Sequence, residues 1–140
     1  MMIEEVMKSA SLLGACSGSE KVSDWKSLAW LFFSPQGREF CEEKNFPELS
    51  LFQRMKEHNI AELGVFVDEG EVYRSNDKCI GLIGDTCGEL KFDENSVVHK
   101  VILMHGAKAH IKASNYVVLL VVNIGGCEVT IDADKTVVVL

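Results

Sequence analysis

Three histidines and three cysteines in the second half of the chain are the side chains best suited to chemistry. They are His99, His105, His110, Cys79, Cys87 and Cys127. Histidine nitrogens and cysteine sulfurs are the usual ligands of zinc, and a cysteine beside a histidine base can act as a nucleophile. A nucleophilic pair would combine Cys87 or Cys127 with His105. The cysteines form no CxxC pair, however, and no recognisable nucleophile turn flanks them. The spacing therefore gives no positive indication of a metal site or of a nucleophilic pair.

Carboxylates and glycines give no clearer signal. The acids at predicted turns are Asp93, Glu94, Asp132 and Asp134. Turn acids usually bond to the local backbone, although two of them on a solenoid could serve as a glycosidase dyad. The glycines of Gly81–Gly84 and Gly125-Gly126 lack the lysine and the following helix of a phosphate loop. We therefore assign no catalytic, cofactor-binding or metal-ligating residue, and we expect a protein that is not an enzyme and needs no cofactor.

The elements that would position these residues form a repeat. Residues 80–92, 101–113 and 121–133 can be laid over one another at offsets of 21 (101 minus 80) and 20 (121 minus 101). A period of this length indicates stacked structural units. Stacking would align equivalent residues in columns: Leu90, Ile111 and Ile131; Phe92, Ala113 and Ala133; Thr86, Ala107 and Cys127; Gly84, His105 and Gly125. No such column contains two metal ligands. We therefore interpret the repeat as a structural scaffold.

Two folds fit the repeat region. In a β-solenoid, that is a right-handed β-helix, each unit of about 20 residues forms one coil. In an antiparallel β-meander or barrel, His105-Gly106 and Gly125-Gly126 would be hairpin turns. The solenoid alone explains why whole units resemble one another, and we favour it. With helices first and strands after, the fold class is α+β.

The first part of the chain carries helical periodicity. Apolar spacing predicts helices over about 1–15, 23–33, 34–44 and 47–58, with Ser23 and Ser34 as N-caps. Asn45 is expected to end the third helix, and Asn59 is expected to end the fourth in the left-handed conformation. The apolar period then changes from about 3.6 to 2 residues. We predict a helical cap over 1–67 and a β-repeat region over 68–140, packed as one unit.

Composition excludes some function classes. The net charge is −7, and no basic stripe is visible, so direct nucleic-acid binding is not expected. The longest apolar run, Tyr116–Val122, is too short to span a membrane. The five cysteines are scattered, which is typical of a reducing compartment, and the N-terminal residues resemble no secretory signal. We expect a soluble cytoplasmic protein.

Several segments resemble a known group of proteins. The segments are Ser34–Pro47, His58–Ile60 with Gly64–Asp68, and Leu103–Ala109 with Ala113–Asn115. They are similar to segments of small proteins that are encoded in prophages and mobile elements of Bacteroides-type gut bacteria. The resemblance covers about residues 30–140. It implies a phage context, and no catalytic or binding residue carries over with it.

These observations favour a function carried out through protein contacts. The apolar residues Thr136–Leu140 would leave the last coil of a solenoid in need of a cap or a partner. We expect a non-enzymatic phage or prophage accessory protein that serves assembly or inhibits a host defence complex. Its partner is a protein, with homo-oligomerisation through the C-terminal end as one form. The alternative is a small-molecule binder that sequesters a nucleotide signal between subunits.

Overall fold

The chain folds into two compact units. A computed structural model describes residues 2–12 and 24–140. The first unit is Met1–Leu63 and the second is Gly64–Leu140. The division falls ahead of residue 67, the boundary expected from the sequence, because Val65–Val67 already pair as a strand of the second unit. Each unit is described by itself below.

The first unit is helical, as the apolar spacing predicts. Its elements are α1 (Met2–Leu12), α2 (Trp25–Phe33), α3 (Pro35–Lys44), α4 (Leu49–Met55), and the short 3-10 helices η2 (Lys56–His58) and η3 (Ile60–Leu63). Ser34 caps α3 by accepting a hydrogen bond from Gly37 N at 3.1 Å. Asn45 and Asn59 end their helices at φ values of 49° and 58°. All three predicted signals are confirmed. No helix within the described ranges is long and apolar enough to cross a membrane.

The start of α2 differs from the prediction. Ser23, the expected cap, lies outside the described residues, and the N-cap is Asp24. Its carboxylate accepts the Ser27 backbone N–H at 2.7 Å, and the Ser27 hydroxyl accepts the Asp24 N–H at 3.1 Å. This reciprocal pair is a capping box. It lowers the pKa of the Asp24 carboxyl, chiefly because the Ser27 hydroxyl bonds to the charged form.

Aromatic contacts build the core of the helical unit. The Phe32 ring lies edge-on to Phe33 and to Phe52, with centroids 5.1 and 6.0 Å apart. Phe33 and Phe52 are buried, whereas Trp30 is 74% exposed. In the apolar run from Ala29 to Phe33, Trp30 therefore lies outside this core. Its neighbours in the run supply the buried face.

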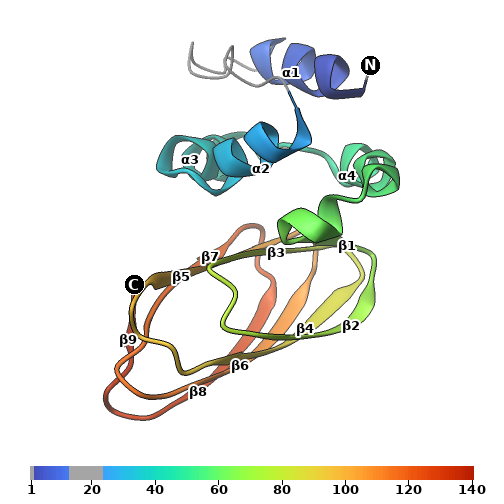
Figure 1. Ribbon diagram of the computed structural model, residues 1–140. Coiled ribbons are helices and arrows are strands. Elements are labelled where there is room, and N and C mark those ends of the chain that lie inside the picture. Colours follow the sequence, from blue (N-terminus) through green and yellow to red (C-terminus); the bar gives the residue numbers. More distant parts are fainter. Residues whose placement is uncertain (1, 13–23) are drawn as a thin grey trace. The chain divides into compact units, whose positions relative to one another are not determined.

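The second unit contains nine strands in two sheets (Figure 1). Sheet A has the order β1 (Val65–Val67), β3 (Cys79–Ile83), β5 (Val98–Met104), β7 (Val118–Asn123) and β9 (Val138–Val139). Sheet B has the order β2 (Gly70–Ser75), β4 (Thr86–Phe92), β6 (Lys108–Ala113) and β8 (Glu128–Ala133). Successive strands of the chain alternate between the two sheets, so each coil contributes one strand to each.

Every strand pairing is parallel, which confirms the β-solenoid and rules out the antiparallel meander. Two of the predicted columns are also confirmed. Leu90 pairs with Ile111, which pairs with Ile131, and Phe92 pairs with Ala113, which pairs with Ala133. The first coil is shorter than the others: Val65 aligns with Gly81 and Gly70 with Thr86, an offset of 16 residues in each case. The unit thus has about four coils, of which the first does not share the 20-residue period.

The core of the solenoid lies between the two sheets. Leu82 and Leu103 from sheet A and Leu90 and Ile111 from sheet B are 0–2% exposed within it. Gly88 meets Leu82 so closely that a Cβ at residue 88 would lie 2.6 Å from the Leu82 Cδ1. Gly88 therefore lets the Leu82 side chain pack closely against the backbone of β4.

One corner of the coils repeats a left-handed backbone. The residue directly after the sheet A strand is Asp68, Gly84 and His105 in the first three coils, with φ values of 49°, 67° and 57°. In the fourth coil the left-handed residue is Gly125, two residues after β7, at 83°. His105 thus lies at a turn in the left-handed conformation. Glycine adopts this conformation without strain, and aspartate and histidine are among the side chains that adopt it more readily than most.

Candidate functional site

His99 lies inside the solenoid. Its ring is fully buried in β5, in the column occupied by Leu119 in β7. Nδ1 lies 2.9 Å from the Asp77 carbonyl oxygen and Nε2 lies 2.7 Å from the Glu94 carbonyl oxygen. The Phe92 ring packs against it at 4.8 Å between centroids. His99 therefore ties two corners of the coils together, and its ring nitrogens are directed at main-chain oxygens.

The other histidines and the cysteines do not converge on one point. His110 points outward from β6, with Nδ1 3.0 Å from Glu89 Oε2, whereas His105 lies at a corner. Cys127 is buried and its thiol donates to the Ile124 carbonyl at 3.5 Å. No group of three or more His, Cys, Asp or Glu side chains that could hold a metal ion occurs in the part of the chain that the structure describes.

The predicted turn acids hold the turns together. Asp93 exchanges hydrogen bonds with Asn76: its N–H donates to Asn76 Oδ1 at 2.8 Å, and Asn76 Nδ2 donates to its carboxylate at 2.7 Å. Ser96 donates hydrogen bonds to the Glu94 carboxylate and so lowers the pKa of Glu94. Thr136 likewise donates hydrogen bonds to the Asp134 carboxylate and lowers the pKa of Asp134. Asp132 lies within β8 and not at a turn, so the corner begins later than predicted, at Asp134.

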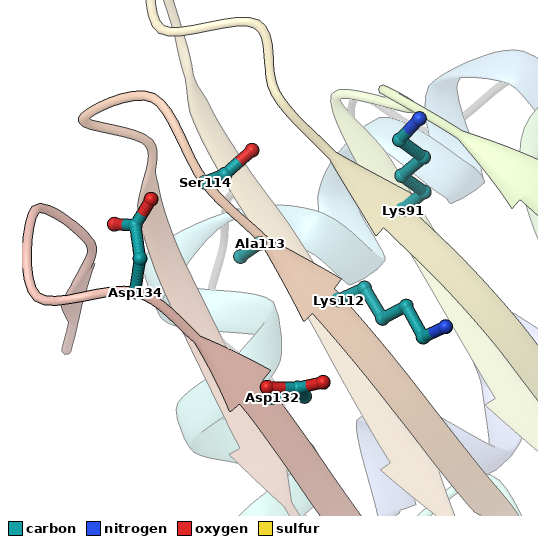
Figure 2. Close-up of a pocket in the computed structure, with 6 residues that line it drawn as sticks. All are labelled: Lys91, Lys112, Ala113, Ser114, Asp132 and Asp134. Carbon is teal, nitrogen blue, oxygen red and sulfur yellow. The ribbon is translucent and has the colours of Figure 1, made fainter.

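A groove crosses the outer surface of sheet B (Figure 2). It measures about 290 Å³ and is lined by Lys91, Lys112, Ala113, Ser114, Asp132 and Asp134. Lys91, Lys112 and Asp132 form one outward column, because their strands pair in that register. The two ammonium groups would attract an anion, but carboxylates line the same groove. Most of the lining side chains are exposed to solvent.

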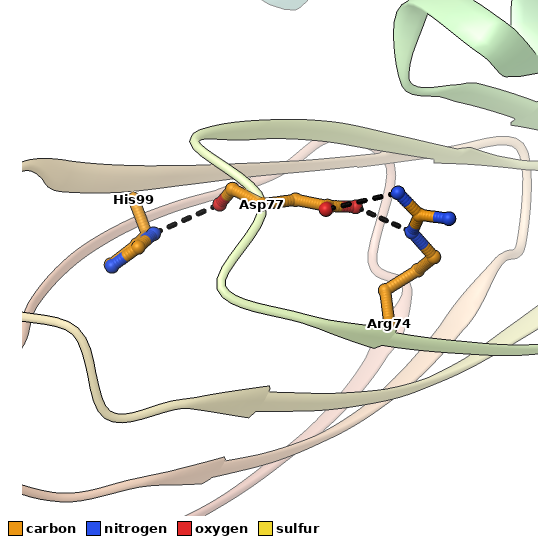
Figure 3. Close-up of polar contacts among 3 residues, drawn as sticks. All are labelled: Arg74, Asp77 and His99. Carbon is orange, nitrogen blue, oxygen red and sulfur yellow. Dashed lines mark hydrogen bonds and ion pairs between the residues drawn. The ribbon is translucent and has the colours of Figure 1, made fainter.

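A charged side chain occupies the first edge of sheet B. Arg74 in β2 occupies the inward column of Leu90 and Ile111. Asp77 holds its guanidinium through two hydrogen bonds, from Nε at 2.7 Å and from a terminal nitrogen at 3.1 Å. The guanidinium carbon lies 5.8 Å from the centre of the Phe66 ring. Figure 3 shows Asp77 between Arg74 and His99. An inward charge of this kind is a known way to keep a strand edge from pairing with another chain.

The last edge of sheet B carries no such charge. In β8 the inward positions are Val129, Ile131 and Ala133, and Ile131 is 37% exposed. The neighbouring edge of sheet A exposes Val138, Val139 and Leu140 at 50%, 45% and 64%. Among the described residues no strand pairs with the outer edge of β8. The backbone groups on that edge and the apolar side chains beside it form a surface that we name the open edge.

The open edge is a candidate docking surface for an extended chain segment. An added strand would pair with the backbone of β8 and cover its apolar inward side chains. The sequence already indicated this end of the chain as a contact surface, because its last residues are apolar. The role of Arg74 was missed, because it depends on an offset of 16 residues and the visible repeat has offsets of 20 and 21. The apolar strand Val65–Val67, which lies 16 residues before Gly81–Ile83, was the available signal.

Comparisons of this chain with protein-family models, with curated proteins and with solved structures give no match.

Proposed function

We propose that this chain is a non-enzymatic protein-binding protein whose contact surface is the open edge at the last coil of the solenoid. One observation carries the proposal, namely the difference between the two edges of sheet B. The first edge has Arg74 in the inward column, held by Asp77, whereas the last edge has Ile131 in that column. An unprotected edge strand is a template for pairing with another chain. The edge at β8 lacks the inward charge that the edge at β2 carries. This difference supports a binding role for the edge at β8.

The biological setting that we propose is a phage or prophage. Its support is the similarity of Ser34–Pro47 and Leu103–Ala109 to proteins of prophages and mobile elements. In that setting the protein acts as an accessory factor, either in assembly or as an inhibitor of a host defence complex. Both versions need a protein partner and no catalytic residue. The protein would work in the host cytoplasm.

A matched pair of variants tests the proposed function. Ile131→Arg places at the open edge the charge that β2 carries, and Tyr73→Arg places the same residue on β2, where Tyr73 is 70% exposed. Partners are captured from phage-bearing host cells with each variant and with the unaltered chain, after circular dichroism has confirmed that each is folded. We expect Ile131→Arg to lose a partner that Tyr73→Arg retains. Equal capture by both variants would contradict the proposal.

A second candidate function is the binding of an anionic small molecule, such as a nucleotide signal. The observation that favours it is the groove of Figure 2, where Lys91 and Lys112 follow one another in a column beside Ser114. Calorimetry with a panel of cyclic nucleotides tests it, and Lys91→Ala with Lys112→Ala is the matched variant. Heat of binding that the variant abolishes would support this function. The absence of heat across the panel counts against it.

A further inference from the structure

We propose that the partner segment at the open edge is basic: an extended stretch that adds to β8 as a strand, with Lys or Arg at alternate positions and apolar residues between them. This inference rests on the proposed function and names the class of its partner. It is argued from the outward and inward faces of sheet B, because a strand added to β8 would continue both.

The last two outward rows of the sheet carry opposite charges. The row of β6 is Lys108, His110 and Lys112, and the row of β8 is Glu128, Thr130 and Asp132. In register, Lys108 faces Glu128, with Nζ 3.7 Å from Oε2, and Lys112 faces Asp132. The basic row is thus followed by an acidic one. A further strand would meet the acidic row first, and cations directly opposite it are favoured, because charges in neighbouring strands interact as cross-strand pairs.

The inward positions of β8 determine which residues of the partner segment should be apolar. Val129 and Ile131 are apolar and belong to the columns of Ala109 and Ile111 in β6. Side chains of a strand alternate between its two faces. A segment that places Lys or Arg beside Glu128 and Asp132 therefore directs its intervening residues toward Val129 and Ile131. Apolar residues at those positions would cover Ile131, which is 37% exposed.

A second copy of the chain fits this edge less well. Stacking β8 on the first strand of another copy, with the columns continued, would bring Glu128 beside Glu71 and Ile131 beside Arg74. Pairing β8 with itself across a two-fold axis centred on Thr130 would bring Glu128 beside Asp132. Like charges directly opposite in neighbouring strands are destabilising. The acidic row therefore favours a partner of opposite charge over self-association.

The experiment uses synthetic peptides of six residues, the length of β8, added to the full chain. One peptide alternates Lys with Val, and its twin alternates Glu with Val. Binding is measured by fluorescence anisotropy and located by amide hydrogen exchange. We expect the basic peptide to bind at least about tenfold more tightly than its twin, to lose affinity as salt is raised, and to slow exchange in residues 128–133. Equal binding of the twins, or protection outside β8, would overturn the proposal.

A charge exchange makes the test independent of any loss of folding. Glu128→Lys with Asp132→Lys reverses the outward row of β8, and both side chains are exposed. We expect this double variant to prefer the acidic peptide. Glu71→Lys, in the same outward column at the first edge, should keep the preference for the basic peptide. A double variant that still prefers the basic peptide would overturn the proposal.

The outcomes separate this inference from the proposed function. If Ile131→Arg abolishes capture of a partner but the basic peptide does not bind, the open edge remains the contact surface and the basic class of partner is wrong. If Ile131→Arg leaves capture unchanged, the proposed function itself fails, whatever the peptides do. A dimer in solution that Ile131→Arg dissociates would also overturn the inference, because it would make a second copy the occupant.

Discussion

Arg74 and Ile131 occupy the same inward column of sheet B, Arg74 in its first strand and Ile131 in its last. Between them the column contains Leu90 and Ile111, which are 2% and 0% exposed. The column therefore begins with a charge held by Asp77 and ends with an apolar side chain at the surface. Because of this asymmetry, we expect the last edge of sheet B, and not the first, to accept another strand.

Arg74→Leu should open the first edge. The substitution continues the apolar column to the surface of β2 and removes the charge that discourages pairing. We expect association that grows with protein concentration, measured by light scattering after size-exclusion chromatography. The lost ion pair itself is worth only about 0.5 kcal/mol, because the Arg74 side chain is 49% exposed.

Ser75→Leu is the matched control for this variant. It adds the same apolar side chain to β2 at the neighbouring outward position and leaves Arg74 in place. A monomer for Arg74→Leu, or equal association of the two variants, would show that the inward charge does not protect the edge.

Ile111→Ala should destabilise the whole solenoid. Ile111 is fully buried at the centre of its column, and truncation of a buried isoleucine costs about 2–5 kcal/mol through lost burial and the cavity that remains. The measurement is the free energy of unfolding in urea. Lys112→Ala, the next residue on the exposed face, should change it by no more than about 0.5 kcal/mol. Similar losses for the two variants would contradict the inward and outward assignment.

The period of the repeat could be predicted from the sequence because three coils share it. Offsets of 21 and 20 placed Leu90, Ile111 and Ile131 in one column, and the strand pairing confirms that column. The caps at Ser34, Asn45 and Asn59 were also predictable, since each depends on local backbone chemistry.

The first coil and the protected edge could not be predicted in the same way. Shortening a coil by several residues changes no local pattern, so Val65–Val67 fits a strand and a connector equally well. Arg74 is an exposed charge by its residue type, and only its pairing with Leu90 shows that it stands in the inward column. The part of the site that sequence reasoning missed is therefore the part that depends on register.

Thr136→Val should raise the pKa of Asp134. The Thr136 hydroxyl, and then its backbone N–H, donate to the carboxylate and hold this pKa below its ordinary value of 3.8. Because this pKa is lower in the folded state, the carboxylate stabilises the fold above pH 3.8. This stability is lost as the pH falls through the pKa of the folded state. Because the substitution leaves the N–H in place, the pKa should move part of the way toward 3.8.

An NMR titration of the Asp134 carboxyl carbon measures this shift directly. Thr130→Val, on the outward face of β8, is the control and should leave the Asp134 pKa unchanged. An unchanged pKa in Thr136→Val would show that the hydroxyl does not hold the carboxylate in solution.

Cys41 should resist alkylation in the folded protein. Burial raises the pKa of its thiol to about 12, so almost none of the reactive thiolate is present at pH 8. Cys79 and Cys87 are only partly buried and should react before Cys41. Mass spectrometry after brief exposure to iodoacetamide distinguishes the sites. Modification of Cys41 as fast as Cys87 without denaturant would contradict the packing of α3.

Hydrogen exchange across sheet B tests most directly the central claim that the edge at β8 is open for binding and the edge at β2 is protected. The amides of residues 70–75 and 128–133 are followed by mass spectrometry in the free chain and in its complex with the captured partner. The account predicts slower exchange in β8 on binding and little change in β2. Slower exchange in β2 with β8 unchanged would contradict it.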